Sequence, residues 1–226
     1  MDRPAIIFDL DGTLADTGAD LAHAMNHCLR IAGRRKVAIA EAEQFAGGGA
    51  RLLIERGLQA TGESSQQLID ELLESFLEYY ARNICVHTSC YPGVHEQLKI
   101  LEEQGYPLGV CTNKPEGLAR SLLQELGIID RFQSIIGGDS LAVRKPEPEP
   151  LVEVMRQLNV SRSILIGDSV TDYKTARAAG QAIILVRFGF GSKGIIEDAI
   201  KMDPDCWIDN FDQLPEALNN LDSCPG

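Results

Sequence analysis

Six short apolar runs constrain the fold of this chain more than any other feature. None of them alternates apolar with polar side chains, which is typical of strands buried on both faces of a parallel sheet. The runs cover residues 5–8, 107–111, 134–137, 163–166, 182–186 and, more weakly, 206–208. Between them leucines recur at helical spacing, as at Leu118, Leu122 and Leu126. Strands that alternate with helices predict right-handed βαβ units in a doubly wound, Rossmann-like α/β core.

The first connection between these runs is far too long for an ordinary loop. Roughly ninety residues separate the run at 5–8 from the run at 107–111, whereas a βα loop usually has about 2–6 residues. Apolar residues in this stretch follow helical spacing, so we predict an inserted all-α cap domain over residues 16–91. Residues 1–15 and 92–226 would then form the α/β catalytic core domain. The insertion begins beside the carboxyl end of the first strand, where ligands bind in open α/β sheets, so we expect it to cover the site.

The formal net charge of −12 limits the partners of this chain. No polybasic stretch offsets it, so we expect neither a nucleic-acid partner nor binding to an anionic membrane surface. The apolar run near the N-terminus is too short for a signal peptide, and no run approaches the roughly 20 apolar residues of a membrane span. We therefore expect a cytoplasmic protein whose six cysteines are reduced. Nothing in the sequence indicates the oligomeric state.

Asp9 and Asp11 directly follow the first apolar run. Residues two apart in an extended chain point the same way, so the two carboxylates form a close acidic pair at a strand end. Such a pair needs a cation, or one member must hold a proton. Both conditions suit phosphoryl transfer, in which one Asp attacks phosphorus and the other moves protons to the leaving group and from water. The alternative is an ordinary turn after a strand, because Asp and Gly are common turn residues.

Polar side chains also follow the next three predicted strands. The second strand ends at Thr112 and Asn113, whose hydroxyl and amide can hydrogen-bond to phosphate oxygens. Lys145 follows the third strand and supplies a compact cation. Asp168 and Asp172 follow the fourth and can complete an oxygen-only Mg²⁺ site with Asp9. Because the carboxyl ends of parallel strands share one edge of a sheet, these sets together predict a phosphoryl-transfer site at that edge.

With these motifs the chain resembles the haloacid dehalogenase superfamily over almost its whole length. The four ordered motifs read Asp9-Leu10-Asp11-Gly12-Thr13, Thr112, Lys145, and Gly167-Asp168 with Asp172. The resemblance implies that Asp9 is the nucleophile and Asp11 the general acid/base. It also implies that Thr112 binds phosphate, with Asn113 as a contact beside it, and that Lys145 stabilises charge.

The same resemblance implies a Mg²⁺ cofactor. Its protein ligands would be the side chains of Asp9 and Asp168 and the backbone carbonyl of Asp11, with Asp172 supporting the site. A helical insertion at this position resembles the first type of cap found in the superfamily.

Within the superfamily the chain is most similar to phosphoglycolate phosphatases. The stretches that carry this similarity are 8–14, 47–53, 145–148 and 188–191. The resemblance implies a Mg²⁺-dependent phosphomonoester hydrolase that acts through an aspartyl-phosphate on a small phosphorylated metabolite, 2-phosphoglycolate first of all. Glu147 stands where His is frequent, and the stretch 188–191 has Phe where Tyr is common, so the substrate stays open.

Other functions use the same fold. A phosphosugar phosphatase or a beta-phosphoglucomutase-like phosphomutase would place a different cap over the same core, and a mutase would need a bisphosphate activator. A non-catalytic binding module predicts the loss of a chemical residue, and none is missing. A dehalogenase is disfavoured by Asp11, because a halide leaving group needs no proton. A phosphonatase is disfavoured because the first cap segment offers only Lys36 as a Schiff-base lysine.

Two glycine-rich stretches suggest further roles. Arg51 follows Gly47-Gly48-Gly49 and opens a cap helix, so we predict that it binds a substrate carboxylate. The alternative is a solvated surface arginine.

Residues 189–194 match the dinucleotide motif G-x-G-x-x-G. Only one weak strand follows them, too little for the rest of a nucleotide-binding half, so we interpret them as a loop at the rim of the site.

Overall fold

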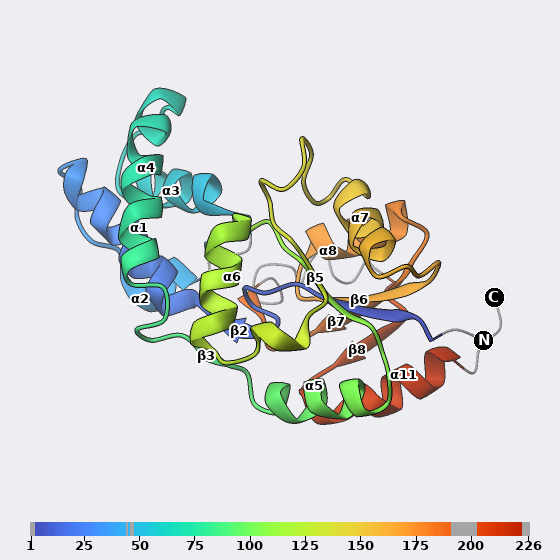
Figure 1. Cartoon of the computed structure of the whole chain (residues 1–226). Coiled ribbons are helices and arrows are strands. Elements are labelled where there is room, and N and C mark those ends of the chain that lie inside the picture. The colour runs from blue at the N-terminus through green and yellow to red at the C-terminus, as the bar shows by residue number, and fades with distance from the viewer. Residues whose placement is uncertain (1–2, 44, 46–47, 191–202, 223–226) are drawn as a thin grey trace.

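The computed structural model describes residues 3–43, 45, 48–190 and 203–222. These residues form a six-stranded sheet in the order β5-β4-β1-β6-β7-β8, and every neighbouring pair is parallel. The strands are β1 Ala5–Phe8, β4 Leu108–Cys111, β5 Ser134–Ile136, β6 Ser163–Gly167, β7 Ala182–Val186 and β8 Cys206–Ile208. This sheet confirms the predicted α/β fold class, and each strand lies at one of the six apolar runs (Figure 1).

Strand β1 lies in the middle of the sheet, and its four residues are completely buried. Ile6 and Phe8 belong to the apolar cluster on one face, whereas Ala5 and Ile7 belong to the cluster on the other. Alternate side chains of a strand point to opposite faces, so a strand covered on both faces must be apolar at every position. This is the physical reason why the runs in the sequence do not alternate.

Helices cover both faces of the sheet (Figure 1). On the face of Ile6 lie α5 Val94–Glu103, α6 Glu116–Glu125 and α11 Leu214–Asp222, whose buried leucines join the same cluster. On the opposite face lie α7 Glu149–Gln157 and α8 Val170–Ala178. Two 3-10 turns, η1 Ile129–Arg131 and η2 Phe211–Gln213, complete the described core. No helix in the described ranges is both long and apolar enough to cross a membrane.

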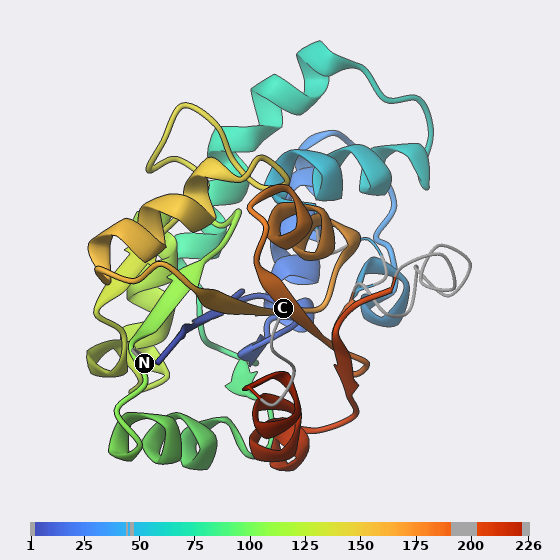
Figure 2. The same cartoon turned by 90° about the vertical axis from the view of Figure 1, so that its right-hand side faces the viewer.

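The long first connection leaves and rejoins the core through a two-stranded ribbon. Strands β2 Ala15–Asp16 and β3 Ser89–Cys90 pair antiparallel, so the outgoing and returning chains lie side by side. The described helices between them are α1 Gly18–Ile31, α2 Ile39–Glu43, α3 Ala50–Gln59 and α4 Gln66–Arg82. They stand together at one end of the sheet (Figures 1 and 2). The predicted boundaries at residues 16 and 91 fall at this ribbon, and the division into two domains stays a prediction.

Asp20, in the first turn of α1, ties the returning chain to the helical insertion. Its carboxylate accepts backbone N–H groups of Val86, His87 and Thr88 at 2.9–3.1 Å, and the Thr88 hydroxyl at 2.7 Å. The carboxylate is almost completely buried, and these donors replace the water it loses. The end of the insertion next to the ribbon is therefore held by these hydrogen bonds as well as by apolar packing.

Candidate active site

The sheet topology creates a crevice between the carboxyl ends of β1 and β6. The connection after β1 leads toward β4, whereas the connection after β6 leads toward β7 on the other side. Adjacent parallel strands whose connections diverge in this way leave a gap in which ligands bind. Asp9 follows β1 and Asp168 follows β6, so the topology places these two carboxylates at the mouth of the crevice.

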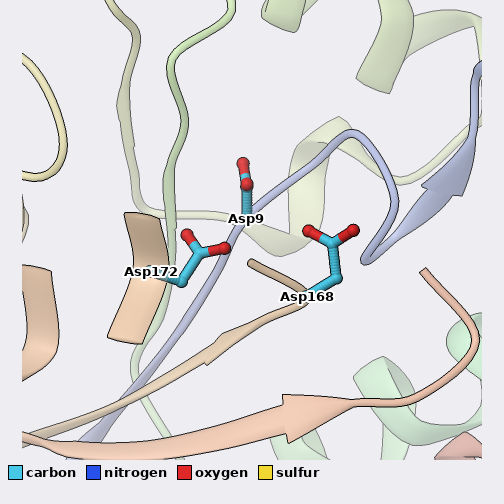
Figure 3. Close-up of side chains that lie close together, drawn as sticks. All are labelled: Asp9, Asp168 and Asp172. Carbon is cyan, nitrogen blue, oxygen red and sulfur yellow. The ribbon is translucent and has the colours of Figure 1, made fainter. Parts of the chain in front are cut away.

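Three carboxylates gather at this point. Oxygen atoms of Asp9, Asp168 and Asp172 all lie within 4.8 Å of one another (Figure 3). Asp168 and Asp172 are buried, and the side chain of Asp9 is 13% exposed. Oxygen-only donor sets of this kind suit Mg²⁺. The structure thus brings together three of the residues that the sequence assigned to the metal.

Asp172 holds its neighbours in place with both of its carboxylate oxygens. It lies in the first turn of α8 and forms a capping box with Ser169, whose hydroxyl donates to Oδ2 at 2.6 Å. The other oxygen, Oδ1, accepts from Lys145 Nζ at 2.6 Å. Because both oxygens are already bonded, Asp172 is better suited to support the site than to serve as a primary metal ligand.

Lys145 lies between the carboxylates of Asp9 and Asp172. Its Nζ is 3.0 Å from Asp9 Oδ2 and 2.6 Å from Asp172 Oδ1, and the side chain is only 1% exposed. Burial by itself lowers the pKa of Lys145, but the charges of Asp172 and Asp9 outweigh it and raise the pKa above its usual value. Lys145 therefore stays charged beside the nucleophile, where a phosphoryl group would bring more negative charge.

The burial of this cluster makes it costly to ionise Asp9. Burial raises the pKa of Asp9; Lys145 opposes this, Asp172 adds to it, and the pKa rises to about 6. A divalent cation at the cluster would oppose this effect of burial and hold Asp9 ionised at neutral pH. The donor chemistry and the raised pKa of Asp9 thus both fit Mg²⁺, held by Asp9 and Asp168. The part assigned to the Asp11 carbonyl stays a prediction.

Glycines leave room for the Asp168 carboxylate. A Cβ atom on Gly12 or on Gly189 would collide with Asp168, and Gly12 also has a φ of +80°, a backbone conformation that favours glycine. On the other side of the site, a Cβ on Gly167 would collide with the side chain of Asp172. Gly12 of the first motif is therefore needed for two reasons: it leaves space for Asp168 of the fourth motif, and it adopts the positive φ of the turn.

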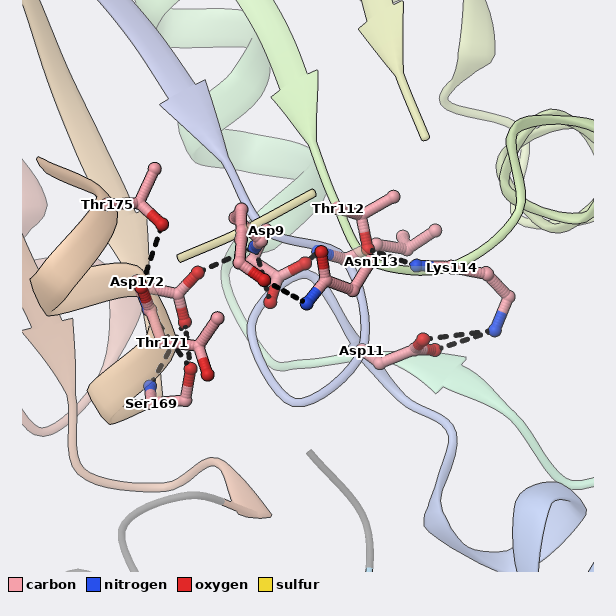
Figure 4. A network of polar contacts seen from close by, with 11 residues as sticks. Asp9, Asp11, Thr112, Asn113, Lys114, Ser169, Thr171, Asp172 and Thr175 are labelled. Carbon is pink, nitrogen blue, oxygen red and sulfur yellow. Dashed lines mark hydrogen bonds and ion pairs between the residues drawn. The ribbon is translucent and has the colours of Figure 1, made fainter. Parts of the chain in front are cut away.

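The Asp11 side chain pairs with a lysine that the sequence analysis missed. Lys114 Nζ lies 2.8 Å from Asp11 Oδ1 and 3.1 Å from Oδ2 (Figure 4). The same Nζ donates to Tyr80 Oη of cap helix α4 at 2.8 Å and lies 4.3 Å from the centre of that ring. Burial lowers the pKa of Lys114, but Asp11 and Tyr80 outweigh burial and raise it. A signal was present: Lys114 comes two residues after Thr112, at the same strand end.

The two polar residues after β4 occupy different positions in the site. The Thr112 hydroxyl is buried, and it accepts the backbone N–H of Lys114 at 3.3 Å. The Asn113 amide donates to the backbone carbonyl of Lys145 at 3.0 Å. Asn113 Oδ1 is buried without a hydrogen-bond partner in the described part of the chain. Asn113 thus anchors the Lys145 loop, and its predicted contact with phosphate stays a prediction.

A cavity with about 680 Å³ of empty space, part of it open to solvent, separates this cluster from the helical insertion. Its core side is polar and includes Asp9, Asp11, Thr112, Asn113, Lys114 and Lys145. Its cap side is mostly apolar and includes Leu21, Gly49, Ala50, Leu53, Phe76, Leu77 and Tyr80. The insertion therefore covers the carboxyl edge of the sheet, as the chain order predicted.

Arg51 is not among the described residues that line this cavity, although its neighbour Ala50 is. Its guanidinium pairs with Asp70 at 2.6 Å and donates to Gln66 at 3.4 Å, and its side chain is 40% exposed. Its assignment to a substrate carboxylate stays a prediction, and it requires the pair with Asp70 to open. Gly47 and residues 191–194, which contain most of the G-x-G-x-x-G match, lie outside the described residues.

Comparison with known proteins gives consistent matches. A family described as haloacid dehalogenase-like hydrolase matches residues 6–186. A relative from Mesorhizobium japonicum, named phosphoglycolate phosphatase, is 40% identical over 221 residues and covers 96% of each chain. The crystal structure of a predicted phosphoglycolate phosphatase from Haemophilus somnus superposes with a TM-score of 0.84 at 30% identity, covering 94% of this chain and 96% of that one. A structure from Lactobacillus delbrueckii subsp. bulgaricus superposes with a TM-score of 0.86 at 31% identity, covering 96% and 99%.

Proposed function

Because the chain belongs to the haloacid dehalogenase-like hydrolases and is a phosphatase of that family, we propose that it hydrolyses phosphomonoesters through an aspartyl-phosphate on Asp9. We propose Mg²⁺ as its cofactor and 2-phosphoglycolate as its substrate. The observation that carries the mechanism is the position of Asp9 on the cavity wall, paired at 3.0 Å with an ammonium that Asp172 holds from behind.

In the first step an oxygen of Asp9 forms a bond to phosphorus while the bond from phosphorus to the ester oxygen breaks. The leaving oxygen takes a proton from protonated Asp11. In the second step Asp11 accepts a proton from water, the water oxygen attacks phosphorus, and the bond to Asp9 breaks. The products are an alcohol and inorganic phosphate, and Asp9 and Asp11 return to their initial states.

The surrounding residues keep this chemistry in place. Lys145 offsets the negative charge on Asp9 and on the phosphoryl oxygens. The Thr112 hydroxyl lines the cavity and can donate to a phosphoryl oxygen. Mg²⁺, when bound by Asp9 and Asp168, supplies a second positive charge for the phosphoryl group. Asp172 takes no part in bond making, because its two oxygens are bonded to Ser169 and Lys145.

The cap side of the cavity supports a small substrate. Among its described lining residues Tyr80 is the one with a polar side chain, so the cap offers few partners for the hydroxyl groups of a sugar. A two-carbon acid such as glycolate leaves less polar surface unpaired against Leu53, Phe76 and Leu77. The name of the Mesorhizobium japonicum relative supports the same substrate. A phosphosugar phosphatase or a phosphomutase is the alternative.

The test is phosphate release from a panel of esters in the presence of Mg²⁺. The panel should contain 2-phosphoglycolate, β-glucose 1-phosphate, glucose 6-phosphate and an aryl phosphate. We expect the highest kcat/KM for 2-phosphoglycolate. A higher value for a sugar phosphate would overturn the substrate, and isomerisation that depends on a bisphosphate would indicate a mutase. Failure to release phosphate from every ester would overturn the proposed activity.

A further inference from the structure

Two lysines line the cavity among its described residues, and they differ in how their charge is used. Lys145 is shared between Asp9 and Asp172, two carboxylates of the core. Lys114 faces one carboxylate, that of Asp11, and one neutral phenol, that of Tyr80. Lys145 lies with the nucleophile, so it belongs to the phosphoryl end of the cavity. Lys114 lies where the core meets cap helix α4.

The surroundings of Lys114 make its ammonium a strong anion-binding group. The side chain is buried, and the centre of the Tyr80 ring lies 4.3 Å from Nζ. Phe76 and Leu118 also line the cavity, and little water competes for the charge because the lysine side chain is buried. Electrostatic attraction is several times stronger in such a setting than in water. A lysine in this position needs an anionic partner, because an unpaired buried charge is costly.

In the structure that partner is Asp11, and this conflicts with catalysis. Both oxygens of Asp11 lie within 3.1 Å of Lys114 Nζ. The proposed mechanism uses Asp11 in its protonated form as the general acid, so Asp11 cannot remain the counter-ion of Lys114 during that step. Its protonation would leave the buried ammonium without a counter-charge unless another anion takes its place. A carboxylate on the substrate is an anion of the same kind and geometry.

We propose that Lys114 is the binding site for the carboxylate of the substrate, and that this carboxylate takes the place of the Asp11 carboxylate beside the ammonium. The inference rests on the proposed phosphatase function and deepens it. The substrate class is a short phosphomonoester with a carboxylate next to the ester-bearing carbon. Such a molecule places its phosphoryl group on Asp9 and its carboxylate on Lys114. Tyr80 donates no charge but fixes the ammonium from the cap, so the cap takes part in recognition through this residue.

The experiment compares 2-phosphoglycolate with its neutral isostere, phosphoglycolamide. The wild-type protein with Mg²⁺ should have a higher kcat/KM for the carboxylate. In Lys114→Met both substrates should lose turnover, because Asp11 loses its partner, but the carboxylate should lose about ten- to a hundredfold more. Circular dichroism and the thermal midpoint check the fold. If this variant does not fold, Lys114→Gln keeps a donor for Asp11 and Tyr80 and tests the same ratio.

Arg51→Ala is the matched comparison, because Arg51 is the competing candidate for the substrate carboxylate and is not among the described residues that line the cavity. Its ratio of kcat/KM for the two substrates should change by less than about twofold, as expected for an exposed pair. If the preference in kcat/KM for 2-phosphoglycolate over phosphoglycolamide disappears in Arg51→Ala and persists in Lys114→Met, the proposal is overturned in favour of Arg51. Equal losses on both substrates in Lys114→Met would mean that Lys114 serves Asp11 alone.

The wild-type protein separates this inference from the function on which it rests. Hydrolysis of an aryl phosphate with Mg²⁺, but no preference for 2-phosphoglycolate over the amide, overturns the carboxylate site and leaves the phosphatase intact. Absence of hydrolysis of all three esters overturns the proposed function itself. A preference that disappears in Lys114→Met and persists in Arg51→Ala supports the proposal.

Discussion

The two ends of the cavity are built in different ways. At the phosphoryl end the charged groups Asp9, Lys145, Asp168 and Asp172 all come from the core, at the carboxyl edge of one sheet. At the cap end, among the described residues, a polar contact crosses from Tyr80 of α4 to Lys114 of the core, and the cap wall is otherwise apolar. The first end is therefore fixed by the core alone. The second exists only when the helical insertion is in place.

This difference separates two tasks. Groups on one rigid sheet hold their distances without any movement of the cap, which suits a reaction at phosphorus that is common to all phosphomonoesters. Groups contributed by both core and cap form their contacts only on closure, which suits recognition of the leaving group. The predictions below test whether changes at the phosphoryl end affect all esters alike and changes at the cap end affect some esters more than others.

The largest effect is expected from Asp9→Asn. The amide cannot form an acyl phosphate, so kcat should fall by at least about 10⁴-fold. Because the change is at the phosphoryl end, 2-phosphoglycolate and an aryl phosphate should be affected equally. Phosphate release under saturating Mg²⁺ measures both. Activity above about 1% of wild type would point to a different nucleophile.

Removal of Mg²⁺ should come next in size. Exhaustive chelation should lower kcat/KM by at least about 10³-fold for charged and neutral esters alike, because the cation would offset charge at phosphorus. Added Mg²⁺ should restore the activity. Ca²⁺ should not, since it takes six to eight ligands at longer distances and would change the position of Asp9. Full turnover in the chelated protein would contradict the metal assignment.

Replacement of Lys145 at the phosphoryl end should lower the free energy of unfolding more than replacement of Lys114 at the cap end. Lys145→Met leaves Asp9 and Asp172 without their counter-charge, and we expect a loss of about 3–5 kcal/mol in the free energy of unfolding. Lys114→Met leaves Asp11, whose side chain is 20% exposed and can be rehydrated, so about 1–3 kcal/mol is expected. Urea unfolding of the chelated proteins measures both values. Equal losses would remove the distinction between the two ends.

The stability of the metal-free protein should depend on pH through Asp9. Its pKa is raised from 3.8 to about 6, chiefly by burial, so the folded protein binds this proton more tightly than the unfolded chain. Stability from this group is therefore greatest below about pH 4 and falls by roughly 3 kcal/mol as the pH rises to 6 and above. Asp9→Asn should raise the thermal midpoint at pH 7.5 and not at pH 4, in the presence of a chelator. A gain of equal size at both pH values would exclude this titration as the cause.

The smallest effect is expected at the cap end, from Tyr80→Phe. The substitution removes the acceptor for Lys114 Nζ and keeps the ring, so about 1 kcal/mol of hydrogen-bond energy is lost. KM for 2-phosphoglycolate should rise by less than about tenfold, and KM for an aryl phosphate should rise less. Steady-state kinetics of wild type and Tyr80→Phe on the two substrates measure both KM values. Identical changes would assign Tyr80 to the general packing of the cap.

Some of the site could be predicted because it depends on strand ends. A residue that directly follows a buried parallel strand must lie at the carboxyl edge of the sheet, whatever the detailed packing. Asp9, Thr112 and Asp168 were found in this way, and the structure places them around one crevice. The six apolar runs predicted the six strands of the main sheet for the same reason, but not the two short strands of the ribbon. The local pattern of apolar residues was enough to predict these strands, because a strand that is buried on both faces must be apolar at every position.

The contacts of Lys114 and Arg51 could not be predicted from local sequence pattern. A lysine two residues after Thr112 looks like any polar loop residue, and only the packing of α4 against the core brings Tyr80 to it. Arg51 had the glycines and helix start expected of a ligand-binding residue, yet its guanidinium pairs with Asp70 on the neighbouring helix α4. Which of two cations faces a cavity depends on how helices pack against each other, and such contacts join residues far apart in the chain.

The α/β fold, the long helical insertion and the set of carboxylates and lysine at the sheet edge could all be predicted from the order of residues along the chain. These features follow from short-range rules: the period of apolar residues, the length of connections and the position of polar residues after strands. The tertiary structure alone decided the division of labour between two lysines, the pairing of Asp11 with Lys114, and the steric need for Gly12 beside Asp168. Each of these depends on distances between segments that the chain order leaves free, and only packing sets those distances.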